Sequence, residues 1–219
     1  MPQLSKTWLL LSTFLTTLVF PTWARTNHRE YSQLVVSVYD SVDIPRPFLD
    51  QAEHEAARIF KPAGVKVLWI NCPTSATNYP PVMTPPDCGL VDWPNRLALR
   101  VVPHSLRFPN EVFGVAFLSD EGVGCYSDVF YDLATGLHAE SKVGVANILG
   151  NVMAHELGHL LLGSNSHALS GIMKARWENE ELERIAKGGL FFTIEQAELI
   201  RERLVASEPP MAVSALASY

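Results

Sequence analysis

Three histidines and one glutamate lie within thirteen consecutive positions of this chain, in the segment HELGHLLLGSNSH. His155 and His159 are four residues apart, so on an α-helix their side chains leave the same face about one turn from each other. Two imidazoles in this arrangement can bind one zinc ion at roughly 2.0 to 2.1 Å. Glu156 stands beside the first histidine, where its carboxylate can take a proton from water activated by the metal and pass it to a leaving group.

A catalytic zinc ion takes three protein ligands and keeps one position open for water, so the helix alone does not complete the site. Gly163 can adopt the left-handed backbone conformation that ends a helix, and the residues SNS after it favour a turn. His167 then arrives on the returning chain, and we predict it as the third ligand of a single catalytic Zn²⁺. The alternative for His167 is an ordinary solvated histidine in a loop.

Two other interpretations of the motif stay open. In the first, the third ligand comes from a later helix: Glu178 and Glu180 follow His159 at a distance that resembles the thermolysin-like clan, although acidic residues so close together are usually a solvated helix face. In the second, the protein is a non-catalytic secreted zinc-binding module. Glu156 argues against the second interpretation, because a structural zinc site fills all four positions with protein ligands and has no use for that carboxylate.

The segment from Met153 to Met173 resembles the metzincin clan of zinc endopeptidases, and among them the matrixin-like branch. The clan motif is HExxHxxGxxH followed by a methionine turn below the metal. This chain reads HExxHxxxGxxxH, with one more residue on each side of Gly163, and its GIM ends at Met173. The resemblance implies three histidine ligands, a glutamate general base and a methionine turn, at His155, His159, His167, Glu156 and Met173 respectively.

The same resemblance implies a substrate. In the clan, the strand that corresponds to GVAFLS, residues 114–119, is the edge of the sheet above the cleft, where an extended peptide can add as one more strand through main-chain hydrogen bonds. The alternative is an edge strand that is covered or blunted by its loop. We therefore expect a zinc-dependent endopeptidase, a hydrolase of peptide or protein substrates.

The elements that must position these residues are read from hydrophobic periodicity and from residues that start or stop helices. Strands are predicted at 31–40, 65–71, 96–102, 114–119 and 126–133, and helices at 47–60, at about 142–162 and from Thr193 to about 206. Both faces of the second helix are apolar and must be largely buried. Thr193 and Gln196 form a plausible capping box at the start of the last helix.

This order of elements predicts an α+β fold: a mixed, mostly parallel five-stranded sheet with two packed helices and a C-terminal helix, as in a metzincin-like catalytic domain. One domain is expected over residues 25–219, with a mobile tail from about residue 207. Residues 1–24 read as a signal peptide, with Lys6 before a short apolar run and Ala24 at the expected cut. The sequence therefore predicts export, to an extracellular or periplasmic location, with no membrane association after cleavage and no inhibitory propeptide.

Charge and cysteine content limit the partners. The net charge is -6 and the basic residues are scattered singly, so no nucleic-acid partner is expected; a monomer is assumed. Three cysteines fit an oxidising compartment, and Cys72 and Cys88 bracket a proline-rich loop that one disulfide would close. Cys125 would then be free, although the other pairings stay open.

Overall fold

The fold is centred on a five-stranded sheet in a computed structural model that describes residues 31–74 and 86–207. The strand order is β2-β1-β3-β5-β4, with β4 antiparallel to β5 and every other pair parallel. The predicted α+β class with a mixed, mostly parallel sheet is confirmed. The strands are β1 (Ser32–Asp40), β2 (Val65–Cys72), β3 (Arg96–Val102), β4 (Gly114–Phe117) and β5 (Tyr126–Phe130).

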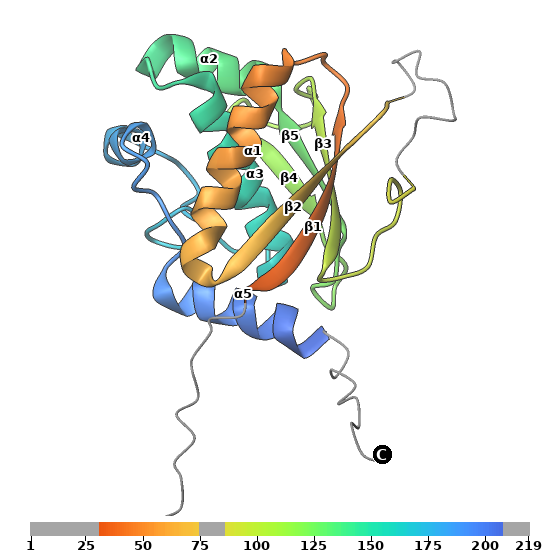
Figure 1. The fold of residues 1–219 in the computed structure, drawn as a ribbon. Coiled ribbons are helices and arrows are strands. Elements are labelled where there is room, and N and C mark those ends of the chain that lie inside the picture. Colours follow the sequence, from red (N-terminus) through yellow and green to blue (C-terminus); the bar gives the residue numbers. More distant parts are fainter. Residues whose placement is uncertain (1–30, 75–85, 208–219) are drawn as a thin grey trace, which may run out of the picture.

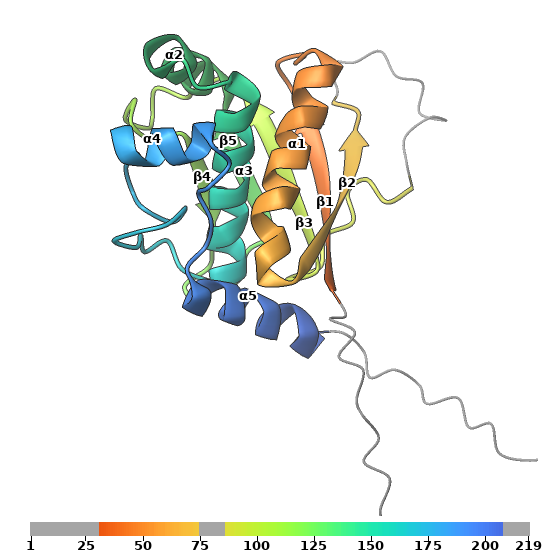
Figure 2. The same ribbon diagram turned by 60° about the vertical axis from the view of Figure 1, so that its left-hand side comes forward.

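Five α-helices accompany the sheet in the described part of the chain, and two of them form the layer that carries the site. In Figures 1 and 2, α1 and α3 lie side by side against one face of the sheet, and α5 runs across their lower ends. Helix α2 lies at the opposite end of α3, and α4 lies beside α3 away from α1. The helices are α1 (Arg46–Phe60), α2 (Tyr131–Ser141), α3 (Val145–Leu162), α4 (Asn179–Ala186) and α5 (Ile194–Ser207), with a 3₁₀ turn at Lys61–Ala63.

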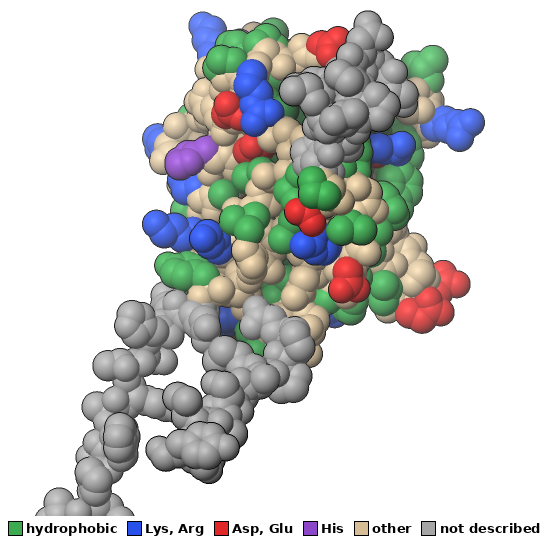
Figure 3. All heavy atoms as spheres, turned by 45° about the vertical axis from the view of Figure 1, so that its right-hand side comes forward, with side chains coloured by type: hydrophobic (Ala, Val, Ile, Leu, Met, Phe, Trp, Pro, Cys, Tyr) green, Lys and Arg blue, Asp and Glu red, His purple; other side chains and the backbone are tan. Residues whose placement is uncertain are grey.

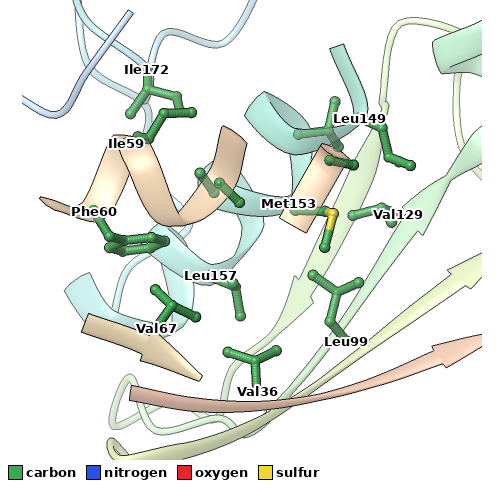
Figure 4. Packing of buried hydrophobic residues seen from close by; sticks show 14 of the residues in the cluster. Val36, Ile59, Phe60, Val67, Leu99, Val129, Leu149, Met153, Leu157 and Ile172 are labelled. Carbon is green, nitrogen blue, oxygen red and sulfur yellow. The ribbon is translucent and has the colours of Figure 1, made fainter. Parts of the chain in front are cut away.

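Helix α3 is the centre of the core. Every residue from Ile148 to Leu161 is buried, which confirms that both of its faces are covered. Figure 4 shows Met153 and Leu157 pointing toward the sheet, where Leu99 lies among the facing strand residues. Because burial of each such side chain contributes roughly 1.5 to 3 kcal/mol, this packing fixes the helix that presents the two histidines.

The predicted strand at 126–133 is wrong beyond Phe130, where the unpredicted helix α2 begins. Phe130 pairs with Val102, the last residue of β3, and Pro103 follows Val102. Since β5 has no ladder partner on β3 beyond this point and proline cannot donate a backbone hydrogen bond, the chain leaves the sheet. The helix predicted from about residue 142 begins at Val145, because Lys142 adopts a φ of 61° that ends α2.

The predicted capping box of the last helix is confirmed. The Thr193 backbone N–H donates to Gln196 Oε1 at 3.0 Å, and the Gln196 backbone N–H donates to Thr193 Oγ1 at 3.3 Å. Helix α4 has a second box of this type, formed by Glu178 and Glu181, in the acidic segment that was expected to be a solvated face. The predicted signal peptide at 1–24 and the tail beyond residue 207 lie outside the described residues.

The other side of the sheet carries a mixed surface. Figure 3 shows charged side chains of both signs spread among hydrophobic and neutral ones on this side. The structure joins Cys72 and Cys88 in a disulfide at the end of β2 and leaves Cys125 as a free thiol.

Among the helices in residues 31–74 and 86–207, none has the length and apolarity needed to cross a membrane.

Candidate metal centre

The structure brings the three predicted histidines together. Side-chain nitrogens of His155, His159 and His167 lie within 4.8 Å of one another, although eleven residues lie between the first and the third in the sequence. Nε2 of His155 and Nε2 of His159 are 3.0 Å apart. The ring of His167 lies 5.4 Å from the ring of His155 and 5.0 Å from that of His159, measured between centroids.

Hydrogen bonds on the far side of two rings decide which nitrogen is free. Nδ1 of His155 lies 2.7 Å from the Ile172 carbonyl oxygen, and Nδ1 of His159 lies 2.7 Å from the Ser164 carbonyl oxygen. A carbonyl oxygen only accepts, so both Nδ1 atoms carry the proton and both Nε2 atoms of the neutral rings carry a lone pair. Two lone pairs therefore face each other at 3.0 Å, an arrangement that a cation between them relieves.

Protonation of the two histidine rings does not supply this cation at neutral pH. Burial, reinforced by the neighbouring His159, lowers the pKa of His155 to about 3. Burial also lowers the pKa of His159. Both rings are consequently neutral near pH 7, which is the state in which imidazole binds a metal ion.

The group has the composition and spacing of a zinc site. Two nitrogens on a tetrahedral zinc ion, each bonded at about 2.0 to 2.1 Å, are about 3.3 Å apart, close to the 3.0 Å between the two Nε2 atoms. Three imidazoles also match a catalytic zinc site, which takes three protein ligands and leaves one position open. Two histidines are buried and His167 is exposed, so the group is open to solvent on the side of the third ring.

The downstream glutamates of the thermolysin-like interpretation do not belong to this group. Glu178 forms the capping box of α4 and accepts a hydrogen bond from Lys174 Nζ at 3.3 Å. Glu180 is an exposed residue in the first turn of the same helix. Within the described residues, no carboxylate joins the three imidazoles.

The chain between the second and third histidines turns back at Gly163. Its φ of 63° is a conformation that glycine adopts without strain, and its N–H closes the helix on the His159 carbonyl at 2.9 Å. After the turn, the Ala168 N–H donates to the Met173 carbonyl at 2.8 Å, so the residue next to His167 is tied to the segment below the helix.

Met173 lies in that segment and packs directly under α3. Its side chain is 1% exposed. A methyl group added to Gly158 would meet Met173 Sδ at 2.7 Å and a ring atom of Phe192 at 2.8 Å, so glycine allows this close approach. The residue before it, Ile172, supplies the carbonyl that holds His155, and the predicted methionine turn is thus in contact with the helix that carries the histidines.

Glu156 is buried against the start of β4. A Cβ atom on Gly114 would lie 2.6 Å from Glu156 Cγ and 2.7 Å from Oε1, so the carboxylate occupies space that only glycine leaves open. Burial, followed by the negative charge of Asp128, raises the pKa of Glu156 from its ordinary value of 4.5 to about 8. The carboxyl group therefore exchanges its proton near neutral pH when no cation is nearby.

Trp177 contacts His155 and its hydrogen-bond partner, and no role was predicted for Trp177 from the sequence. Its Nε1 donates to the Ile172 carbonyl at 3.3 Å, and the same oxygen accepts the hydrogen bond from His155 Nδ1. The centroids of the Trp177 and His155 rings are 5.9 Å apart. Gly114 was likewise unassigned. For both, the only sequence signal is proximity in the chain: Trp177 follows the methionine turn, and Gly114 begins the edge strand.

A cavity of about 490 Å³ lies over the histidines, lined mainly by apolar surface. Its walls come from β4 and the loop before it, from α2 and α3, and from the segment after Met173. The lining residues are Asn110–Ala116, Leu137, Glu140, Val152, His155, Glu156, His159, Asn165, His167 and Lys174–Trp177. Strand β4 is the last strand of the sheet, so its outer edge borders the cavity without a further strand in the described residues.

Comparisons with known proteins give only distant likenesses. No protein-family model matches the sequence, and no curated protein matches it. Among solved structures, the archaemetzincin of Methanopyrus kandleri matches with a TM-score of 0.45 and 19% identity, over 80% of this chain and 97% of that one. A zinc-dependent peptidase of Methanocorpusculum labreanum matches with a TM-score of 0.47 and 16% identity, over 75% and 99%. Likenesses this distant say nothing about chemistry, which must be inferred from the residues of this chain.

Proposed function

We propose that this protein is an exported, metzincin-like zinc endopeptidase that hydrolyses peptide bonds in peptides or proteins. The observation that carries the proposal is the pair of unprotonated Nε2 atoms of His155 and His159, which face each other at 3.0 Å with His167 beside them. Their other nitrogens are locked onto carbonyl oxygens, so the site is preorganised for a cation. Zinc, when bound, supplies a Lewis acid that lowers the pKa of a water molecule and polarises a carbonyl group.

Glu156 is the general base of this proposal. It directly follows the first histidine ligand, it lines the cavity, and its Oε1 lies against the edge strand. Its carboxylate accepts a proton from the attacking water, and the carboxylic acid so formed donates that proton to the leaving amine, a role that suits a carboxyl group with a raised pKa. Gly114 leaves the space in which the side chain reaches this position.

The substrate is proposed to bind as an extended peptide along β4. Gly114, Val115 and Ala116 line the cavity, and within residues 31–74 and 86–207 β4 pairs with only one neighbour, β5. The free side of this strand can form main-chain hydrogen bonds with a peptide irrespective of its side chains. Export is inferred from the signal-like residues 1–24 and is consistent with the disulfide between Cys72 and Cys88.

Two measurements test the proposal. The first is the zinc content of the purified protein and of the variants His167→Ala and Glu180→Ala. We expect one zinc ion per chain in the wild type and in Glu180→Ala, and strong loss of zinc in His167→Ala. Loss of zinc in Glu180→Ala alone would show that the third ligand is downstream, as in the thermolysin-like interpretation.

The second measurement is digestion of a peptide library with and without a chelator, by the wild type and by Glu156→Gln. Cleavage by the wild type alone, abolished by the chelator, is the expected result. If the wild type and Glu156→Gln both bind zinc and neither cleaves any peptide, the protein is a zinc-binding module without catalysis. Digests of the library also define the preferred side chains on either side of the cleaved bond.

A further inference from the structure

The last turn of α3 is held by two side chains from distant parts of the chain. Trp93 Nε1 donates to the Leu160 carbonyl at 3.0 Å, and Arg203 Nη1, from α5, donates to the Leu161 carbonyl at 2.8 Å. The guanidinium of Arg203 also lies over the Trp93 ring, 5.8 Å from its centroid. The two donors therefore contact each other as well as the helix.

These contacts supply hydrogen-bond partners for carbonyl groups at the C-terminal end of the helix. The last four carbonyl groups of an α-helix have no partner within the helix, and the C-terminus carries a partial negative charge that favours a nearby cation. In α3, the turn at Gly163 and Ser164 satisfies the His159 carbonyl. The next two carbonyls are satisfied by Trp93 and Arg203, and α5 lies across this end of α3 in Figure 2.

The chain leaves α3 through a tightly enclosed turn at the same place. A Cβ atom on Gly163 would lie 2.5 Å from Arg203 Nη1 and 2.8 Å from the Gly122 carbonyl oxygen. Gly122, in the turn between β4 and β5, and Arg203 thus both approach Gly163 closely enough to exclude a side chain there. Together they fix the direction in which the loop toward His167 begins.

His159 lies in this turn and depends on it twice. Its carbonyl accepts the N–H groups of Gly163 at 2.9 Å and of Ser164 at 3.3 Å, and its ring Nδ1 donates to the Ser164 carbonyl at 2.7 Å. A shift of the last turn moves the second histidine and the start of the loop that carries the third. His155, one turn earlier and held by Ile172, is anchored separately.

We infer that Arg203 and Trp93 are positioning residues of the zinc site: they lock the C-terminal turn of α3 and thereby set the relative placement of His159 and His167. This inference rests on the proposed zinc site. It assigns to α5, which contributes no residue to the cavity, a role in the geometry of the metal ligands. Loss of partners outside the ligands themselves typically lowers metal affinity by about 10-fold to 100-fold, and we expect about 10-fold here.

The test compares Arg203→Met and Trp93→Phe with the wild type in the full-length protein. The first removes the guanidinium and keeps the apolar stem, and the second removes the indole N–H and keeps an aromatic ring. Arg203→Lys is the conservative variant, and Arg201→Met is the matched control, since Arg201 lies on the same helix and packs near Gly64. The measurements are the zinc dissociation constant, by competition with a chromophoric chelator, and the visible absorption spectrum of the cobalt-substituted protein, which reports ligand geometry.

We expect zinc binding about 10-fold weaker in Arg203→Met and in Trp93→Phe, with an altered cobalt spectrum, and partial recovery in Arg203→Lys. Affinities within twofold of the wild type and unchanged spectra in both variants would overturn the inference. Equal weakening in Arg201→Met would also overturn it, because a general loss of stability would then explain the effect. If Arg203→Met does not fold, Trp93→Phe decides alone.

The metal measurements need no peptidase activity, so the two proposals fail separately. A wild-type protein that binds zinc but cleaves nothing refutes the proposed endopeptidase and leaves the affinity comparison valid. A wild-type protein that cleaves peptides while the variants keep normal zinc affinity refutes only the positioning role. Failure of the wild type to bind zinc overturns both.

Discussion

The buried carboxyl group of Glu156 makes a quantitative prediction about the metal-free protein. Its pKa is about 8 in the folded chain against an ordinary value of 4.5, which applies to the unfolded chain. Between these values the folded state holds a proton that the unfolded state has lost. The unfolded state therefore binds fewer protons in this window, and the free energy of unfolding falls as pH rises.

The expected size follows from the shift. Each pH unit inside the window lowers the free energy of unfolding by about 1.4 kcal/mol, so the loss between pH 5 and pH 8 is about 4 kcal/mol. The side-chain amide in Glu156→Gln cannot ionise, so the unfolding free energy of this variant lacks the pH dependence that comes from Glu156. We expect the free energy of unfolding of Glu156→Gln, relative to wild type, to increase by about 1.4 kcal/mol per pH unit from pH 5 to pH 8.

Urea denaturation in the presence of a chelator, at half-unit pH steps, measures this difference. His155, whose pKa is lowered to about 3, acts in the opposite direction between pH 3 and pH 6.5, but it is present in both proteins and cancels. Glu180→Gln, the same substitution at an exposed residue, is the control for the chemical change itself. A flat difference for Glu156→Gln would show that the carboxyl group titrates normally and is not buried as described.

Saturating zinc should weaken the dependence of the wild-type unfolding free energy on pH, because a nearby cation stabilises the Glu156 carboxylate. Zinc at 100 times its dissociation constant should also stabilise the wild type by about 2.7 kcal/mol. Thermal unfolding should show that this stabilisation is lost in His159→Ala. Gly158→Ala should lower the free energy of unfolding by about 1 kcal/mol in denaturation experiments, because overpacking against Met173 outweighs the helix propensity of alanine. Gly114→Ala should displace Glu156 and lower kcat by about 10-fold to 100-fold, while zinc affinity, measured by chelator competition, stays within about twofold; unchanged kcat would contradict the contact with β4.

Local sequence patterns sufficed where the chain's own periodicity decides the structure. The apolar run on both faces of α3 requires burial, the spacing of its two histidines requires a shared face, and the capping box at Thr193 starts α5. The boundaries of α2 did not follow from such patterns. The residues YSDVFYDL favour a strand by composition, but the strand ends at Phe130, which pairs with Val102, the last residue of β3.

The sequence by itself determined the chemistry on offer: two imidazoles one helical turn apart, a carboxylate between them, and a glycine able to turn the chain back toward a third imidazole. Only the tertiary structure decided the protonation of these groups and the pKa of the carboxyl group. The proton positions on His155 and His159 depend on carbonyls of Ile172 and Ser164 that lie beyond the helix, and the raised pKa of Glu156 depends on burial beside β4. The Ile172 carbonyl and strand β4 come from outside the HELGH segment, and the Ser164 carbonyl meets the His159 ring only after the chain turns at Gly163, so the spacing of the motif does not encode these contacts.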